Sequence, residues 1–416
     1  MSSAPSSRID TVVVGAGPAG IAVSERLAWA GHEHVVLERD RVGSTWRTQR
    51  WDGFLLNTPN WMTGLPGHPD AFGTAGDLLA DLERRAAGLP VREGVAVRGV
   101  WRERGGGYLV AAGDQVLRCR HVVAASGAQR VPRFPAAARA MASDGIEHVH
   151  VGELRRLDAL PDGGVLVVGS GQSGAQVAEE LLGAGRRVVL ATSRVGRAPR
   201  RHRGRDVTSW WRDMGRLDDS RDAVGEAARR GAQPLVAGGR TISLQRLARA
   251  GAELAGRLAA ADGTRVRFTG DPAEHAAFAD ADADARRAQI DAWIARTGAD
   301  APAHEPDPAE VPLRPGEVVG REELDLRAAG IRSVVWATGF DGDFGWLRMP
   351  IRDAAGLPLH RGVTTAAPGL FVLGVPWLVR RVSSSVYGIE RDAAIVAARI
   401  LAAAAGTPAV RRAVAA

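Results

Sequence analysis

Two apolar runs in the chain end in the same glycine-spaced turn. Residues 9–14 lead into a Gly-x-Gly-x-x-Gly sequence at residues 15–20, and the apolar run 165–168 leads into the same spacing at residues 169–174. Such a run predicts a buried parallel strand, and the glycines predict a tight turn into the helix of a dinucleotide-binding βαβ unit. Two such sites in one chain predict that electrons pass between two cofactors.

The first unit continues with a predicted helix over residues 21–30 and a strand over residues 35–38. Glu38 ends this strand about 20 residues after the turn, where an acid is expected to bind a ribose hydroxyl. The expected cofactor contacts of this unit are Gly15, Gly17, Pro18, Ala19, Gly20, Glu38 and Arg39.

The second unit continues with a predicted helix over residues 175–182 and a strand over residues 187–191. This strand ends in Thr192, Ser193 and Arg194 instead of an acid, which favours the extra 2′-phosphate of NADPH over NADH. Most members of the basic run 197–205 are expected to be a solvated surface loop. The expected cofactor contacts are Gly169, Ser170, Gly171, Gln172, Ser173, Gly174, Ser193, Arg194 and Arg201.

Further cofactor contacts are expected outside the two glycine turns. Asn57 lies between apolar residues and a turn that contains proline, and a buried amide there needs a partner, for which a cofactor is one candidate. Residues 122–127 and 331–340 each predict a strand ending in a turn of small residues, and serines precede a predicted helix at 388–401. The expected residues of this group are Ser44, Thr45, Trp46, Arg47, Asn57, Val97, Ser126, Gly127, Ala337, Thr338, Gly339, Phe340, Gly374 and Ser384.

Between the second unit and the last strands, residues 204–315 are rich in alanine, arginine and aspartate. Amphipathic spacing over residues 244–258 and 285–297 predicts helices, with a short strand at 265–268. We expect a helical extension of the second unit that caps the substrate site.

Composition limits the classes of function. The 416 residues are 45% hydrophobic and 24% charged, as in ordinary globular proteins, and the net charge of +7 is spread among acids, so no nucleic-acid partner is expected. The single Cys119 excludes an intramolecular disulfide and a dithiol redox pair, and it is expected to be a buried or edge thiol. With no membrane-length apolar run and no export signal, a cytoplasmic location is expected. His148 and His150 lack further ligands nearby, so no metal site is expected.

The two glycine turns, together with residues 43–47 and 337–340, resemble class B flavin-dependent monooxygenases. The resemblance implies an α/β fold of two Rossmann-like domains in which FAD binds the first turn and NADPH the second. It implies that the NADPH domain is inserted into a discontinuous FAD domain, with expected ranges of 1–160, 161–322 and 323–416. It also implies that Asn57 is catalytic, close to the flavin and its oxygen adduct.

A narrower resemblance links residues 199–206 and 369–377 to a bacterial branch labelled as flavoproteins involved in potassium transport, a label to which we give no functional weight. The family's linker signature is poorly kept, with His150 as its one match, and the Trp-Pro ending of the Baeyer-Villiger version is missing.

The resemblance implies an NADPH-dependent enzyme that forms a C4a-(hydro)peroxyflavin and oxygenates a small molecule at nitrogen or sulfur, with dioxygen as co-substrate. Baeyer-Villiger oxidation of a carbonyl substrate stays open, as do an NADPH oxidase and a non-catalytic redox sensor. A homodimer also stays open. A flavin disulfide reductase is excluded by the lone cysteine, and the second nucleotide motif disfavours an amine oxidase.

Overall fold

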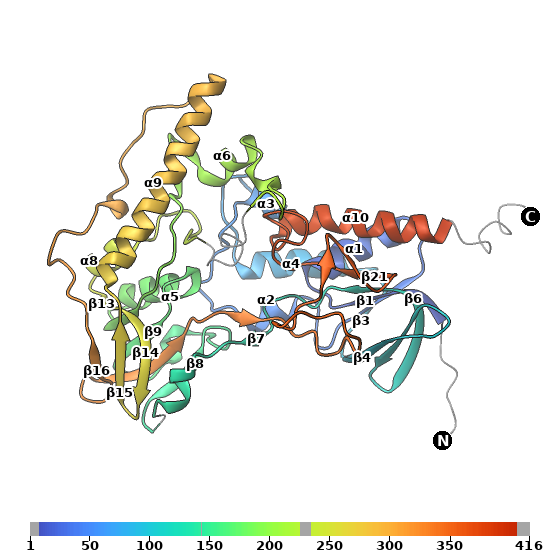
Figure 1. Cartoon of the computed structure of the whole chain (residues 1–416), viewed down its shortest axis with the longest axis horizontal. Helices are drawn as coiled ribbons and strands as arrows, with labels where there is room; N and C mark the ends of the chain where they lie inside the picture. Colours follow the sequence, from blue (N-terminus) through green and yellow to red (C-terminus); the bar gives the residue numbers. More distant parts are fainter. Residues whose placement is uncertain (1–7, 143, 225–233, 406–416) are drawn as a thin grey trace, which may run out of the picture.

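The computed structural model describes residues 8–142, 144–224 and 234–405. Two α/β units lie side by side, each built on a sheet with a core of parallel strands (Figure 1). The chain passes between them twice, and the two passes pair as antiparallel strands β7 (Val131–Pro132) and β18 (Phe340–Asp341). One apolar cluster contains buried residues of both sheets, such as Val13 and Val167, so the units share a core.

The first sheet has the strand order β19-β20-β21-β6-β1-β2-β3, and the β4-β5 hairpin extends from β6. Strands β21, β6, β1, β2 and β3 run parallel, which brings their carboxyl ends to one edge. The strands are β1 (Arg8–Val14), β2 (His34–Leu37), β3 (Val91–Arg92), β4 (Val97–Arg102), β5 (Tyr108–Ala112), β6 (Gln115–Ala124), β19 (His360–Arg361), β20 (Thr364–Thr365) and β21 (Leu370–Val372).

Helices α1 and α10 pack side by side in the first unit (Figure 1). Helix α1 begins directly after the glycine turn because Gly17 is its extended N-cap and Pro18 fits its first position. The helices of this unit are α1 (Pro18–Trp29), α2 (Ser44–Thr48), α3 (Asn60–Thr63), α4 (Ala75–Ala86) and α10 (Val386–Ala405).

The second sheet has the order β13-β10-β9-β17-β8, and all of its strand pairs are parallel. Helix α5 follows β9, and a separate antiparallel sheet β14-β15-β16 lies at the outer side of this unit (Figure 1). The elements are β8 (Glu147–His150), β9 (Gly164–Val168), α5 (Gln172–Gly183), β10 (Val188–Ala191), β13 (Glu253–Ala255), β14 (Arg257–Asp262), β15 (Arg265–Thr269), β16 (Glu323–Asp325) and β17 (Ile331–Trp336).

Several short elements and one long helix complete the second unit. Helix α9 crosses the upper left of the view in Figure 1. The elements are β11 (Arg201–His202), β12 (Arg205–Asp206), α6 (Val207–Asp213), α8 (Leu244–Arg249) and α9 (Pro272–Thr297), with 3-10 turns η1 (Ala136–Ala140), η2 (Leu157–Ala159), η3 (Arg216–Asp218) and η4 (Pro308–Glu310).

The predicted helical extension over residues 204–315 is wrong in part. The helix predicted over residues 244–258 ends at Arg249, because the chain turns at Gly251 with a φ of +102° and then enters β13 and β14. Helix α9 is longer than predicted, because Asp271 caps it and it begins at Pro272, thirteen residues before the expected start at residue 285. Its cap Oδ1 accepts a hydrogen bond from Ala273 N at 2.7 Å.

The predicted domain ranges differ from sheet membership at three strands. Strands β8 and β17 flank β9 in the second sheet, and β16 pairs with β15 in the outer sheet of the same unit, although the predicted ranges 1–160 and 323–416 assign all three to the first unit. Strands β8 and β17 lie next to the segments that connect the two units. There the sequence can predict a strand, but it does not show which of the two sheets the strand joins. Within the described residues, no helix is long and apolar enough to span a membrane.

Candidate cofactor sites

The first glycine turn is tightly packed at two of its glycines and open at the third. Gly15 has a φ of +105°, and a Cβ there would lie 2.7 Å from the carbonyl oxygen of Ala125. A Cβ on Gly20 would overlap the carbonyl oxygen of Gly15, whereas no atom lies within 4 Å of a Cβ built on Gly17. The turn therefore requires glycine for its own packing at residues 15 and 20 and leaves room for a ligand at residue 17.

Predicted contacts from distant segments meet at the first turn. Ala16 N donates a hydrogen bond to Glu38 Oε2 at 2.7 Å, and Gly43 N donates to Ala16 O at 3.0 Å, which fixes the start of α2 beside the turn. Ser126 lies next to Gly15, and its hydroxyl oxygen is buried without a hydrogen-bond partner among the described residues. Because buried polar atoms rarely go unpaired, this hydroxyl fits a ligand with hydrogen-bonding groups.

The second glycine turn repeats this geometry. Gly169 has a φ of +108°, and a Cβ there would lie 2.6 Å from Ala337 O. A Cβ on Gly174 would overlap Gly169 O, and a Cβ on Gly171 would meet nothing within 4 Å. The turns of residues 125–127 and 337–339 thus support the two glycine loops in the same way, and both loops fit a pyrophosphate at a helix N-terminus.

Asn57 comes from the first unit and contacts the helix that follows the second glycine turn. Its side-chain Nδ2 donates a hydrogen bond to Gln172 Oε1, and its Oδ1 accepts one from Gln176 Nε2 at 2.8 Å. Its backbone carbonyl accepts a hydrogen bond from Arg200 Nη1 at 3.0 Å. The structure therefore gives the predicted amide three protein partners and brings it to the first turns of α5.

The segment that carries Asn57 lies along one face of α5. Gln172, Gln176 and Glu180 are spaced by four residues, so they share this face. Glu180 Oε1 accepts a hydrogen bond from Trp51 Nε1 at 2.8 Å, and burial raises the pKa of its carboxyl group. Trp51 is therefore a buried contact between the units. The sequence analysis missed Gln176 and Glu180, although their four-residue spacing was visible.

Most arginines of the basic run 197–205 form ion pairs with acids of the same protein. Arg197 and Arg200 are buried, which contradicts a solvated loop: Arg197 pairs with Asp280 and Glu310, and Arg200 with Asp206. Burial also lowers the pKa of Arg200. Both can be buried because acids neutralise their charges: those of Arg197 lie far along the chain, whereas that of Arg200 lies six residues away.

Two predicted arginines stay at the surface. Arg194 is exposed, with its guanidinium 4.6 Å from the centre of the Phe278 ring. Arg201 is exposed and donates to Gly204 O. Ser193 N donates to Ser170 Oγ at 3.1 Å, which fixes the chain just before Arg194. These two cations are the available partners for a 2′-phosphate among the arginines that the sequence singled out.

The remaining predicted contacts lie in several separate elements and differ in exposure. Ser44, Thr45, Trp46 and Arg47 form α2, and Val97 begins β4. Arg39 and Gly339 are exposed, while Gly127, Thr338 and Phe340 are half-buried in the turns that follow β6 and β17. Gly374 has a φ of +73°, and a Cβ there would lie 3.2 Å from the Cβ of Ala19 in the first turn.

The three serines before α10 differ in their roles. Ser384 is exposed. Ser383 Oγ accepts hydrogen bonds from Val379 N and Arg380 N at 3.0 Å each, and Ser385 Oγ accepts one from Gly388 N at 3.2 Å. Ser383 and Ser385 therefore organise the loop, and Ser384 keeps a hydroxyl that is free to face solvent or a ligand.

Two further chemistry-bearing groups lie away from the glycine turns. Cys119 is buried, as predicted, and burial raises the pKa of its thiol to about 12. Asp10, His32 and His121 bring ligand-type atoms within 4.8 Å of one another, a grouping that the sequence analysis missed. Arg120 lies 3.6 Å from Asp10 Oδ2, so this cluster also contains a competing cation.

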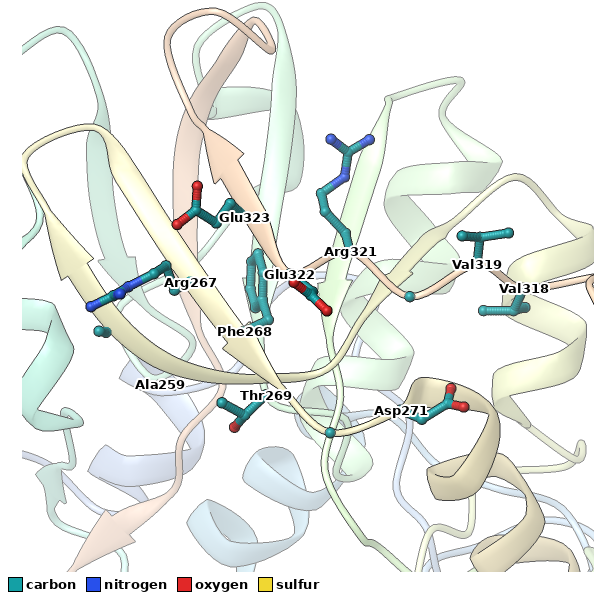
Figure 2. A pocket seen from close by; sticks show the side chains of 13 residues that line it. Ala259, Arg267, Phe268, Thr269, Asp271, Val318, Val319, Arg321, Glu322 and Glu323 are labelled. Atoms are coloured by element: carbon teal, nitrogen blue, oxygen red, sulfur yellow. The ribbon is translucent and has the colours of Figure 1, made fainter.

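A surface pocket lies outside the cofactor sites. Figure 2 shows it where β15 leads toward α9 and the chain returns to β16, with Phe268, Asp271, Val319 and Arg321 among its labelled side chains. None of the predicted cofactor contacts lines this pocket within the described residues. Its mixed charges and position give it no part in the site built by the glycine turns.

Two dinucleotide-type turns in one chain, with Asn57 of the first unit bonded to the helix of the second turn, define a fold with two dinucleotide-type sites. The family model for pyridine nucleotide-disulphide oxidoreductases matches residues 9–209. A protein of Geobacillus kaustophilus named an uncharacterized CzcO-like oxidoreductase is 26% identical over 396 residues, covering 92% of this chain and 96% of its own length. Rice indole-3-pyruvate monooxygenase YUCCA1 is 33% identical over 186 residues, covering 41% of this chain and 44% of its own.

Solved structures share the whole fold. A flavin-containing monooxygenase from Stenotrophomonas maltophilia matches with a TM-score of 0.63 and 17% identity, over 96% of this chain and 99% of its own. OTEMO in complex with FAD and NADP matches at 0.56 and 18% identity, over 94% and 85%. A bacillithiol disulfide reductase from Staphylococcus aureus matches at 0.57 and 12% identity, over 95% and 99%.

These findings confirm the predicted resemblance to class B flavin-dependent monooxygenases and the two-unit α/β fold. The matched family model and the Geobacillus relative are both described as oxidoreductases. FAD and NADP, the predicted cofactor pair, are the ligands of the OTEMO structure with the same fold.

Proposed function

We propose that this chain is an NADPH-dependent flavoprotein monooxygenase that inserts one oxygen atom into a small organic substrate at nitrogen or sulfur. One observation carries the proposal: Asn57, an amide from the first unit, is bonded to the first turns of the helix behind the second glycine turn. That arrangement supports a reaction site shared by two dinucleotides. In this proposal residues 15–20 hold FAD and residues 169–174 hold NADPH.

FAD, when bound, supplies the oxygen chemistry, with NADPH as its reductant. The open faces of Gly17 and Gly171 admit the two pyrophosphates, whose charge is stabilised at the N-termini of α1 and α5. Ser126 gives its unpaired hydroxyl to the first cofactor. Asn57 offers an amide N–H between the two sites, and the packed segment around Trp51 limits the entry of water.

The domain ranges of the proposal follow the two cofactors. The first cofactor uses residues 1–160 and 323–416 without strands β8, β16 and β17, and the second uses residues 161–322 together with these three strands. Arg194 reads the 2′-phosphate of NADPH because it is exposed and directly follows the strand-end serine.

A disulfide reductase of the same fold is the nearest competing class. It requires a thiol that can form a thiolate and a partner thiol, whereas the chain has one cysteine. Burial raises the pKa of that thiol, Cys119, to about 12. Dithiol chemistry is therefore outside the reach of this chain.

The test supplies purified FAD-loaded protein with NADPH, dioxygen and separate sets of amines, sulfides and ketones. We expect NADPH consumption and a product heavier by one oxygen atom from an amine or a sulfide. An ester from a ketone would replace the proposal with Baeyer-Villiger oxidation. Consumption of NADPH with hydrogen peroxide as the only product in every set would contradict oxygenation and identify an oxidase or a sensor.

Asn57→Ala examines the residue that carries the proposal. We expect product formation to fall about 100-fold, the scale for losing one preorganised hydrogen-bond donor, while NADPH consumption continues and hydrogen peroxide replaces product. Asn60→Ala is the matched control, because Asn60 Nδ2 bonds only the backbone carbonyls of Pro66 and His68 among its described contacts. It should lower stability without changing the product yield per NADPH. Equal yields in both variants would remove the catalytic role of Asn57.

A further inference from the structure

Three side-chain amides form a directional chain between the units. Gln172 Nε2 donates a hydrogen bond to Pro234 O at 3.2 Å, and Gln172 Oε1 accepts one from Asn57 Nδ2. Asn57 Oδ1 in turn accepts one from Gln176 Nε2 at 2.8 Å. Because each amide has one donor end and one acceptor end, reversing any one of them would break the alternation.

This chain of hydrogen-bonded amides determines which way the Asn57 amide faces. Its oxygen is engaged by Gln176, so its nitrogen must point toward Gln172. An amide nitrogen carries two hydrogens, and Gln172 uses one of them. The second N–H has no partner among the described hydrogen bonds, so it is available to a ligand, and the bond from Gln176 to the oxygen holds its direction.

The backbone and the side chain of Asn57 are held by different residues. Arg200 Nη1 donates to Asn57 O and to Ala237 O at 3.0 Å each, so Arg200 fixes the main chain. Gln176 is 4% exposed and contacts the side chain alone among its described hydrogen bonds. It lies one helical turn beyond Gln172 on α5, so its position depends on the helix that begins at the second glycine turn.

We propose that Gln176 is a positioning residue that sets the orientation of the Asn57 carboxamide and ties it to the helix of the second dinucleotide site. The proposal rests on the proposed function, in which Asn57 donates a hydrogen bond beside the flavin. Gln176 itself does not touch the reacting atoms. Its role is to keep the free N–H of Asn57 directed at the shared site.

The sequence allows this orientation to be observed directly. Asn57 and Asn60 are the only asparagines in the chain, so protein labelled with ¹⁵N in asparagine side chains gives two amide groups in a proton–nitrogen NMR spectrum. Asn57→Asp assigns the Asn57 pair by its loss. Asn60, whose Nδ2 bonds Pro66 O at 3.1 Å and His68 O at 3.2 Å, is an internal reference.

The main variant is Gln176→Glu, which keeps the side-chain shape and replaces the N–H donor with a carboxylate. The carboxylate repels Asn57 Oδ1 and attracts Nδ2, so we expect both Asn57 proton signals to shift while the Asn60 signals stay in place. Gln176→Met removes the donor without adding charge and covers the case in which the carboxylate prevents folding. Gln115→Glu, at an exposed position of the β5-β6 hairpin, is the control for added charge.

The second measurement is the share of NADPH electrons that ends in hydrogen peroxide when the FAD-loaded protein turns over. We expect both Gln176 variants to raise this share about tenfold, which corresponds to losing one ordinary hydrogen bond, with Gln115→Glu unchanged. Unchanged Asn57 signals in both Gln176 variants would overturn the positioning role, and so would shifted signals with an unchanged peroxide share. If the unsubstituted protein makes only peroxide, the proposed function fails, whereas the NMR comparison still decides how Asn57 is held.

Discussion

The glycine turns at residues 15–20 and 169–174 have almost the same backbone conformation. They differ in the side chains that bond the backbone beside them. Their first glycines have φ values of +105° and +108°, and each turn is supported by the carbonyl of a neighbouring strand end. At the first turn the carboxylate of Glu38 accepts a hydrogen bond from Ala16 N, whereas at the second the hydroxyl of Ser170 accepts one from Ser193 N. The backbone thus provides for a pyrophosphate, and the side chains at the strand end select the nucleotide.

The two turns also differ in what lies against the helix that follows. Helix α5 carries Gln172, Gln176 and Glu180 on the face that receives Asn57 and Trp51 of the first unit. Helix α1 instead packs against α10 of its own unit. Among these described contacts, it is therefore the helix of the second turn that bonds side chains of the other unit.

We expect the largest effect from replacing the last glycine of either turn with alanine. In Gly174→Ala the new Cβ overlaps Gly169 O, so we expect NADPH to bind about 100-fold more weakly, the upper end of the cost of overpacking, with FAD content retained. Gly20→Ala should instead remove FAD, because its Cβ overlaps Gly15 O. FAD absorbance per chain and NADP⁺ titration measure the two effects.

The control for this pair lies on the same helix. Gly183→Ala places a Cβ where no atom lies within 4 Å, so both affinities should stay unchanged. If Gly174→Ala and Gly20→Ala lost the same cofactor, the assignment of one dinucleotide to each turn would be wrong.

Both turns were predictable because their requirement for glycine is local. A positive φ and an overlap between Gly20 and Gly15, five residues apart, are encoded in the spacing itself. The burial of Arg197 was not predictable, because its partners Asp280 and Glu310 lie 83 and 113 residues further along the chain. Only folding brings those acids to it.

Strand β13 and the Asn57 site show the same limit. Residues 253–255 follow a helical pattern, but pairing with β10 makes them a strand, and pairing is a long-range property. Asn57 was predictable as an amide in need of a partner. Its protein partners were not, because Gln172 and Gln176 are 115 and 119 residues away.

A smaller effect is expected at the end of β10. Arg194→Ala should raise the NADPH concentration required about 10- to 100-fold and leave NADH use unchanged, since a charge-assisted hydrogen bond to a phosphate is worth about 1.5–3 kcal/mol. Steady-state kinetics with both nucleotides measure the difference. Arg201→Ala is the matched control, an exposed arginine already bonded to Gly204 O. If Arg201→Ala alone weakened NADPH, the phosphate contact would belong to Arg201.

The smallest effect concerns the imidazole of His275, which bonds Thr192 just after β10 in the second unit. His275 Nδ1 lies 2.8 Å from Thr192 Oγ1; burial lowers the pKa of His275 below 6.5, with Arg194 also lowering it and Glu274 and Asp271 opposing. Above pH 6.5 the imidazole is neutral in both states, so its contribution to stability is fully present. As the pH falls below 6.5 the unfolded chain takes up the proton first, and that contribution is lost as the pH falls through the pKa of the folded state.

His275→Gln should therefore lose less free energy of unfolding than the unsubstituted protein between pH 7 and pH 5, as measured by urea denaturation at a series of pH values. His68→Gln, at an exposed position, should follow the unsubstituted curve. Parallel curves for His275→Gln and the unsubstituted protein would show that the imidazole is not held neutral at the second turn. The second turn would then be insensitive to pH. The difference between the two turns would rest on Arg194 and Glu38 alone.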